Sequence, residues 1–284
     1  MLFALAAASH RFKTSDGPPA VDDQHRGAPF QTINQGTEPI LGLRDANLFH
    51  KAKIAFWIAL FKRPDGQVAH GYLAKPEQAA GASAIVVIQE WWGVNDQIRG
   101  VADRLASAGY IALVPDLFRG KSTVEAEEAH HLMTGLNFAD AASQDIRGAV
   151  QFLKTSSGKV GVTGFCMGGA LTLLALGFAP EVDAGVVWYG CPPLEYIDAA
   201  KIKAPLLAHW AIQDQFFPIA TVDQLQDKLR EASVNFEFHR YLAHHTFANE
   251  TAVGPGRIPA TQYDPVWSQR AWDRSFLFFG RWLS

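Results

Sequence analysis

The chain has 284 residues, a length that one large domain with a single core can hold, and its formal net charge of −3 combines 25 basic and 28 acidic side chains. These charges are spread along the chain, so the sequence offers neither a basic patch for nucleic acid nor a polybasic membrane motif. No run of residues approaches the roughly 20 apolar positions that a membrane span requires. We therefore expect a soluble protein without nucleic-acid or membrane partners.

Residues 1–50 differ in composition from the rest of the chain. Residues 1–9 are mostly apolar but lack the basic n-region of a secretion signal, so we do not expect export. The residues that follow are rich in Gly, Pro and polar side chains without a sustained period, which predicts an extended or partly disordered arm over residues 1–50. A helical or oligomer-forming arm is the alternative. Residues 51–284 would then form the folded domain.

The first segments of this domain predict a β-hairpin. Residues 53–61 form a strongly apolar run, Pro64-Asp65-Gly66 is typical of a turn, and residues 67–75 can return as a second strand. We expect the two strands to be antiparallel and to lie at one edge of a sheet.

From residue 84 onward, strand-like and helix-like segments alternate. The expected strands cover residues 84–89, 111–114, 159–163, 184–189, 205–211 and 236–242. The expected helices include one with Ile98, Val101, Ala102 and Leu105 on its apolar face and others over residues 140–155, 170–178, 221–232 and 265–283. This alternation predicts an α/β fold, with a mainly parallel sheet, helices on both faces and the hairpin at one edge.

The hexapeptide Gly164-Phe165-Cys166-Met167-Gly168-Gly169 lies between an expected strand and an expected helix. It is typical of a nucleophile elbow, the tight turn of α/β-hydrolases, with cysteine in the place usually held by serine. Gly164 and Gly168 stand where a side chain would collide with the returning chain. The alternative is a glycine-rich turn of a plain doubly wound fold, in which the buried cysteine is only a small apolar side chain.

Two further segments place an acid and a base after expected strands. Asp214 follows the run of residues 205–211, and His245 follows the run of residues 236–242. Nucleophile, acid and histidine then occur in the chain order of the α/β-hydrolase triad, each where open α/β sheets bind their ligands. His244 could be mistaken for the base on spacing alone, but the Thr-Phe pair that follows favours His245.

A catalytic role for Cys166 needs help from its surroundings. A free thiol has a pKa near 8.5, so a nucleophilic cysteine requires an adjacent base or a helix N-terminus, and the motif offers both. A disulfide between Cys166 and Cys191, the two cysteines of the chain, would block this chemistry. We therefore expect a reducing, cytoplasmic setting.

The sequence predicts neither a metal nor a cofactor. His130 and His131 lie in a helix-like acidic stretch, but adjacent histidines on a helix diverge, and no cysteine or carboxylate completes a ligand set.

From about Lys53 to its end, the chain resembles the dienelactone hydrolases, the carboxymethylenebutenolidase-like family of α/β-hydrolases. The resemblance rests on five segments in the same order: Gln89-Glu90-Trp91-Trp92-Gly93-Val94-Asn95, Val114-Pro115-Asp116-Leu117-Phe118, the elbow hexapeptide, Gln213-Asp214-Gln215-Phe216-Phe217-Pro218 and His245-Thr246-Phe247. It implies Cys166 as nucleophile, Asp214 as acid and His245 as base.

The resemblance also implies roles for residues around the triad. Glu90 would be the carboxylate that contacts the resting cysteine and helps to deprotonate it, although by itself Glu90 could equally cap a helix or pair with Arg99. The backbone amides of Trp91 and Met167 would form the oxyanion hole. Tyr189, Trp92 and Arg119 would bind the substrate.

One departure from the family pattern concerns the substrate. The best-known members bind the carboxylate of dienelactone with two arginines. Arg119 is near the first place, whereas the second place reads Ala248-Asn249-Glu250 without an arginine. Because a carboxylate would lose a strong charged partner, we expect weak activity on dienelactone and comparable or better activity on neutral esters or lactones.

The leading hypothesis is a cofactor-independent hydrolase of small esters or lactones that works through an acyl-cysteine, as a monomer or small homo-oligomer. A general carboxylesterase or a thioesterase is an alternative of the same class. An alternative of another class is a non-catalytic hydrolase-fold protein that binds a small ligand or senses oxidants through its thiol.

Overall fold

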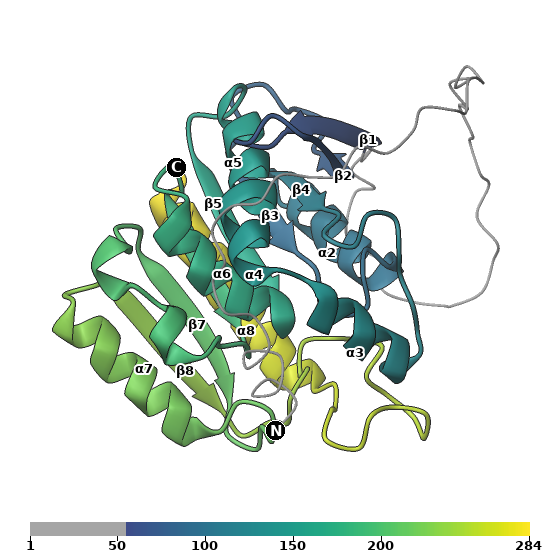
Figure 1. Ribbon diagram of the computed structural model, residues 1–284, viewed down its shortest axis with the longest axis vertical. Coiled ribbons are helices and arrows are strands. Elements are labelled where there is room, and N and C mark those ends of the chain that lie inside the picture. Colours follow the sequence, from purple (N-terminus) through teal and green to yellow (C-terminus); the bar gives the residue numbers. More distant parts are fainter. Residues whose placement is uncertain (1–54) are drawn as a thin grey trace, which may run out of the picture.

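A computed structural model of the protein describes residues 55–284 (Figure 1). The predictions of an arm over residues 1–50 and of no export signal concern residues outside this range. The described chain forms one eight-stranded sheet in the order β1-β2-β4-β3-β5-β6-β7-β8. Its strands are β1 (Ala55–Lys62), β2 (Val68–Lys75), β3 (Ala84–Ile88), β4 (Ile111–Pro115), β5 (Val160–Phe165), β6 (Ala184–Trp188), β7 (Leu206–Ala211) and β8 (Phe236–Tyr241).

The sheet confirms the predicted topology. β1 and β2 pair antiparallel at one edge, with Ala55 opposite Lys75 and Lys62 opposite Val68. β2 joins β4 antiparallel, and all pairs from β4 to β8 are parallel. The central strands are buried along their whole length because helices cover both of their faces.

The helices of the structure follow the strands in chain order. They are α2 (Asp96–Ser107), α3 (Ala126–Gly135), α4 (Phe138–Asp140), the π-helix η1 (Ala141–Ile146), α5 (Arg147–Lys154), α6 (Met167–Phe178), the short 3-10 turns η2 (Leu194–Tyr196) and η3 (Ala199–Lys201), α7 (Ile219–Glu231) and α8 (Pro265–Trp282). α2 and α8 pack on one face of the sheet, and α5, α6 and α7 pack on the other (Figure 1). The predicted α/β-hydrolase fold is confirmed.

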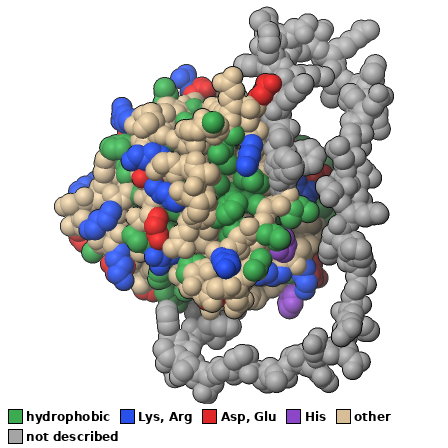
Figure 2. Space-filling view, turned by 90° about the horizontal axis from the view of Figure 1, so that it is seen from above, with side chains coloured by type: hydrophobic (Ala, Val, Ile, Leu, Met, Phe, Trp, Pro, Cys, Tyr) green, Lys and Arg blue, Asp and Glu red, His purple; other side chains and the backbone are tan. Residues whose placement is uncertain are grey.

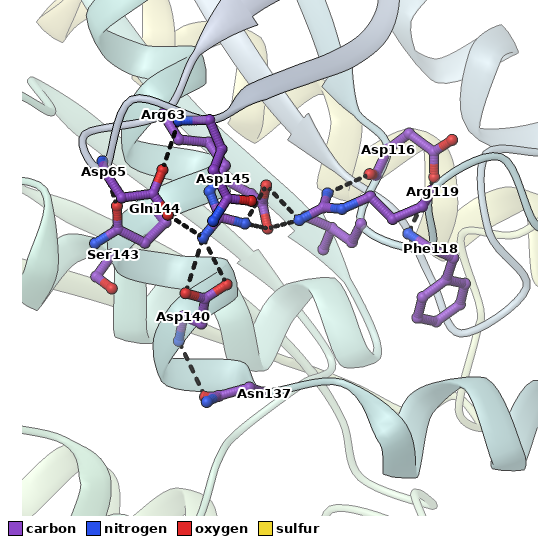
Figure 3. Close-up of polar contacts among 12 residues, drawn as sticks. Arg63, Asp65, Asp116, Phe118, Arg119, Asn137, Asp140, Ser143, Gln144 and Asp145 are labelled. Atoms are coloured by element: carbon purple, nitrogen blue, oxygen red, sulfur yellow. Dashed lines mark hydrogen bonds and ion pairs between the residues drawn. The ribbon is translucent and has the colours of Figure 1, made fainter. Parts of the chain in front are cut away.

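Residues 140–155, expected as one regular helix, contain π turns over Ala141–Ile146. Asp140 and Asp145 are five positions apart and would point about 140° apart on an α-helix. The wider π turn places both carboxylates beside Arg63 instead (Figure 3): Arg63 Nη2 lies 2.9 Å from Asp140 Oδ1, and Arg63 Nη1 lies 3.3 Å from Asp145 Oδ1. The irregular helix therefore lets both carboxylates pair with Arg63.

This charge network ties the edge hairpin to the helical layer. Arg63 also contacts Asp65 in the hairpin turn at 2.8 Å, and Arg119 from the loop after β4 contacts Asp145 at 2.9 Å. The Asp145 side chain is 2% exposed and serves both arginines. Such a buried carboxylate contributes to stability mainly because its removal would take a counter-charge from the buried Arg63, which would keep only its contacts with Asp65 and Asp140.

On the face that Figure 2 shows, Lys and Arg side chains are scattered among other types rather than joined into one basic patch. No helix within residues 55–284 is both long and apolar enough to cross a membrane.

We predict that Asp145→Asn lowers the free energy of unfolding by about 2 kcal/mol, because the buried Arg63 loses its one buried counter-charge and keeps only Asp65 and Asp140, while Arg119 is 47% exposed and loses little. Urea unfolding measures this change. Asp96→Asn is the matched control, because it breaks an exposed ion pair between Asp96 and Arg99. The Asp96 side chain is 99% exposed, so this substitution should change the free energy of unfolding by less than about 0.5 kcal/mol. Equal effects of the two substitutions would contradict a structural role for the network.

Candidate active site

Four loops at the carboxyl edge of the sheet bring the predicted site residues together. Glu90 follows β3, Cys166 follows β5, Asp214 follows β7 and His245 follows β8. Because these strands are parallel, their carboxyl ends meet at one edge, and the four side chains reach one site although up to 155 positions separate them in the chain.

Cys166 occupies a strained turn between β5 and α6. Its backbone has φ 53° and ψ −115°, a conformation that non-glycine residues rarely adopt. A Cβ on Gly164 would collide with the carbonyl of Gly168, and a Cβ on Gly168 would collide with the carbonyl of Ile88. The two glycines therefore allow the close approach that pushes the sulfur to the end of the strand, as the elbow motif predicts.

His245 is oriented by a buried carboxylate. Its Nδ1 lies 2.7 Å from Asp214 Oδ2, and both side chains are almost completely buried. The other oxygen, Asp214 Oδ1, accepts hydrogen bonds from the backbone N–H groups of Phe216 and Phe217 at 2.8 and 3.0 Å. With Nδ1 turned to Asp214, the opposite ring nitrogen is left to hydrogen-bond Cys166.

The thiol and the imidazole titrate as one pair. Burial by itself would lower the pKa of His245, but the charges of Cys166 and Asp214 outweigh it and raise the pKa to about 10. Burial raises the pKa of Cys166, and Glu90 adds to the rise, while His245 and the N–H of Met167 act in the opposite direction. The pair therefore holds its proton firmly and can shift it between sulfur and nitrogen.

Glu90 lies beside this pair without a cationic side chain of its own. Its Oε2 accepts a hydrogen bond of 2.7 Å from Asn249, and its Oε1 lies 3.4 Å from the Tyr189 hydroxyl. Burial raises the pKa of Glu90, and the charge of His245 and these two hydrogen bonds oppose that rise. Only 2% of Glu90 is exposed, so its charge acts in a medium of low dielectric constant.

The two simpler interpretations of Glu90 do not fit. The cap of α2 is Asn95, whose side chain accepts from the N–H of Ile98 at 3.1 Å. Arg99 pairs with Asp96 at 3.0 Å.

Donors for a developing oxyanion lie at the start of α6. The N–H of Met167 belongs to the first helical turn, which has no intrahelical acceptor, and it hydrogen-bonds the Cys166 sulfur. Trp91 directly follows Glu90 and lines the same pocket. The use of both amides as an oxyanion hole stays a prediction.

Above these groups is a pocket of about 290 Å³. Its walls are largely apolar: Trp91, Trp92 and Phe216 form an aromatic side, and Val124, Met133, Val253 and Ile258 add aliphatic surface. Cys166, His245 and Glu90 lie among the lining residues. This volume is at the lower end for ligand sites and suits a small molecule.

Two residues predicted to bind the substrate lie elsewhere. Arg119 is not among the residues that line the pocket, because its guanidinium group pairs with Asp145 and with the backbone carbonyl of Asp116 (Figure 3). Tyr189 is fully buried behind the wall, where its ring packs edge-on against His245 with centroids 5.2 Å apart. Trp92 does line the pocket.

Other pocket residues were not predicted from the sequence. Asn249 was noted only for the arginine that it replaces, yet its side chain contacts Glu90. Thr246 has φ 61°, a rare conformation for a β-branched residue, and its buried hydroxyl has no hydrogen-bond partner among residues 55–284. Arg257 reaches the pocket from the loop before α8, with its Nη1 bonded to the carbonyls of Ile258, Pro259 and Thr261.

Within residues 55–284, no three His, Cys, Asp or Glu side chains come together as a metal site would require.

The raised pKa of His245 predicts how stability depends on pH. The folded state holds this proton more tightly than the unfolded chain, which releases it near pH 6.5, so the folded state binds more protons just above that value. The stabilisation is therefore fully present below about pH 6.5 and is lost as the pH rises above it. Urea unfolding across pH 6 to 10 should show this decline, and His245→Gln should flatten it. An equally steep decline in the variant would contradict the assignment.

Comparisons with known proteins identify the family of the chain. A family model described as the dienelactone hydrolase family matches residues 69–283. The protein usf of Aquifex pyrophilus is 34% identical over 231 residues, which cover 78% of this chain and 96% of that protein. A protein of Aquifex aeolicus named "Putative carboxymethylenebutenolidase" is 31% identical over 230 residues, which cover 77% of this chain and 96% of that protein.

A solved structure shows the same similarity at the level of the fold. The crystal structure of a protein described as "Putative Dienelactone Hydrolase", from Klebsiella pneumoniae, superposes with a TM-score of 0.68 at 26% sequence identity. The similarity covers 80% of this chain and 99% of that chain. The range that the family model covers, residues 69–283, contains the elbow, the aspartate and the histidine described above. The chain therefore belongs to the dienelactone hydrolase family, a family of carboxylic ester hydrolases.

Proposed function

We propose that this protein hydrolyses small esters or lactones through a Cys166–His245–Asp214 triad and an acyl-cysteine intermediate. The observation that carries the proposal is the continuous relay of hydrogen bonds from Asp214 through His245 to Cys166, at the base of a pocket of substrate size. Asp214 would hold the imidazole in one tautomer and stabilise the imidazolium form that the reaction creates.

The first half of the reaction forms the acyl-enzyme. The Cys166 proton moves to His245 as the sulfur attacks the substrate carbonyl, and the carbonyl oxygen becomes an oxyanion held by the N–H groups of Met167 and Trp91. The intermediate collapses when the C–O bond of the leaving group breaks, and His245 returns its proton to the departing alkoxide. In a lactone, the ring-opened alcohol stays attached to the acyl group.

The second half regenerates the enzyme. His245 takes a proton from water as the water attacks the thioester, and the second tetrahedral intermediate expels the thiolate. The carboxylic acid leaves, and the proton on His245 returns to the sulfur. No cofactor is needed for this cycle.

The small pocket with aromatic and aliphatic walls supports a compact, largely apolar substrate. Carboxylesterase and thioesterase activities share the mechanism and remain alternatives within it. A thiol redox sensor is less well supported, because sensor cysteines are exposed and acidic, whereas Cys166 is 8% exposed and burial raises its pKa. A cytoplasmic location and a monomeric or small homo-oligomeric state stay predictions.

We expect Cys166→Ala to lower kcat/KM for a short activated aryl ester by at least about 10³-fold, because the nucleophile is lost. Mass spectrometry of the quenched wild-type reaction should show an adduct of one acyl group. Cys191→Ala is the control, since Cys191 is buried and hydrogen-bonded to the carbonyl of Pro192. Wild-type turnover by Cys166→Ala would sink the proposed mechanism.

A second prediction concerns charge on the substrate. Arg257 is the only Lys or Arg among the pocket-lining residues of the described chain, and its Nη1 is already bonded to backbone carbonyls. A neutral ester should therefore be hydrolysed about 10-fold or more faster, in kcat/KM, than an ester of the same size that carries a carboxylate, given the usual strength of a charged hydrogen bond.

Activity on the charged ester could arise because Arg257 binds the substrate or because Arg257 only stabilises its loop. The variant Arg257→Gln separates these two explanations. It should change both rates by a similar factor if Arg257 only stabilises its loop. A selective loss for the carboxylate-bearing ester, from an initially high rate, would show instead that Arg257 binds anionic substrates.

A further inference from the structure

Asn249 has every polar atom of its side chain engaged, although it lies in a loop beside the pocket. Its Oδ1 accepts two hydrogen bonds from Thr251, from the backbone N–H at 2.9 Å and from the hydroxyl at 2.7 Å. Its Nδ2 donates to Glu90 Oε2 at 2.7 Å. Because the backbone N–H of Thr251 can only donate, the amide oxygen must face Thr251, and the NH₂ group is thereby aimed at Glu90.

The partners of Glu90 make this contact important. Asn249 and the Tyr189 hydroxyl donate to its two oxygens, and Tyr189 keeps its proton because burial, and then the charge of Glu90, raise its pKa well above the ordinary value. The titratable groups that face Glu90 are His245, Tyr189, Cys166 and Glu250. Glu250 is engaged by Arg104 at 2.9 Å. The donor with the shortest hydrogen bond to Glu90 is thus an uncharged amide.

We propose that Asn249 is a positioning residue that holds the Glu90 carboxylate in its ionised form beside the Cys166–His245 pair and so helps to keep the proton on the resting thiol. The inference rests on the proposed function of this pair. It assigns a role to Asn249, which lies in the segment where the best-known family members have an arginine. Asn249 acts through Glu90 and not on the substrate.

The direction of the effect follows from the contacts. A hydrogen bond to a carboxylate favours its ionised form, so Asn249 lowers the pKa of Glu90 below the value that burial alone would give. The ionised Glu90 in turn disfavours a thiolate on Cys166 in the resting site, whereas the family resemblance implied that Glu90 helps to deprotonate this thiol. Removing the Asn249 donor should let Glu90 take up a proton at neutral pH. The thiolate would then form at lower pH.

The test measures the thiol itself rather than turnover. In a Cys191→Ala background, Cys166 is the one thiol of the chain, and its rate of alkylation by the neutral reagent iodoacetamide is followed by mass spectrometry from pH 5 to 10. Asn249→Leu, which matches asparagine in shape but cannot donate, should move the midpoint of this profile down by about one pH unit, as expected for loss of one hydrogen bond to a charged group.

Glu90→Gln completes a double-mutant cycle. It should lower the midpoint as well, and Asn249→Leu should add no further shift when Glu90 is already neutral. Thr251→Val removes one of the two bonds that orient the amide, so a smaller shift in the same direction is expected. An unmoved midpoint in Asn249→Leu, or additive shifts in the double variant, would overturn the inference. If thermal unfolding shows that the leucine variant does not fold, Asn249→Ala takes its place in the cycle.

These outcomes are distinct from the fate of the proposed function. Ester turnover by Cys166→Ala would reject the acyl-cysteine mechanism while the alkylation profile still reported on Asn249. An active wild type whose midpoint ignores Asn249 would reject only the positioning role.

Discussion

The site depends on one steric constraint, the close approach of the turn after β5 to its neighbours. Gly164 and Gly168 leave no room for a Cβ, and the chain between them must carry Cys166 at a positive φ. This conformation directs the sulfur out of the strand and starts α6 at Met167, whose N–H has no intrahelical acceptor and hydrogen-bonds the same sulfur. The proposed nucleophile and one proposed donor for the oxyanion are therefore adjacent in the chain, and the same turn positions both of them.

Burial then decides how the charges behave. Burial pushes the thiol and Glu90 toward their neutral forms; the charge of His245 and two hydrogen bonds oppose this push at Glu90, and the neighbours of His245 support its charged form. A site of this kind does not hold a permanently reactive thiolate. The proton of the Cys166–His245 pair can move across one hydrogen bond. This arrangement protects the sulfur at rest and, in the proposed mechanism, keeps proton transfer to the leaving group within the site. Both carboxylate oxygens of Asp214 are hydrogen-bonded, one to two backbone N–H groups and the other to His245, and these bonds fix the orientation of the imidazole.

What the sequence predicted correctly was either local or periodic. The elbow glycines, the hairpin turn and the alternation of strands with helices are short-range patterns, and the structure confirms the sheet, its antiparallel edge and the helices on both faces. The π turn and the positions of Arg119 and Tyr189 were not predictable in this way. Each depends on a partner far away in the chain, Arg63 for the π turn, Asp145 for Arg119, and Glu90 with His245 for Tyr189. Family resemblance could suggest that these side chains are near the site, but not which partner they would contact.

The two departures from the expected substrate contacts have separate causes and one shared effect. Arg119 is drawn to Asp145 because the π turn presents that buried carboxylate to the loop after β4. Asn249 replaces a cation by an amide that Thr251 turns toward Glu90. Either change alone would leave one positive charge of the family pattern for an anionic substrate. With both changes, the one Lys or Arg side chain that lines the pocket within residues 55–284 is Arg257, whose Nη1 is already bonded to backbone carbonyls. An acyl group that carried its own negative charge would lie near the Glu90 carboxylate, which supports the proposed preference for uncharged esters in a pocket whose walls are largely apolar.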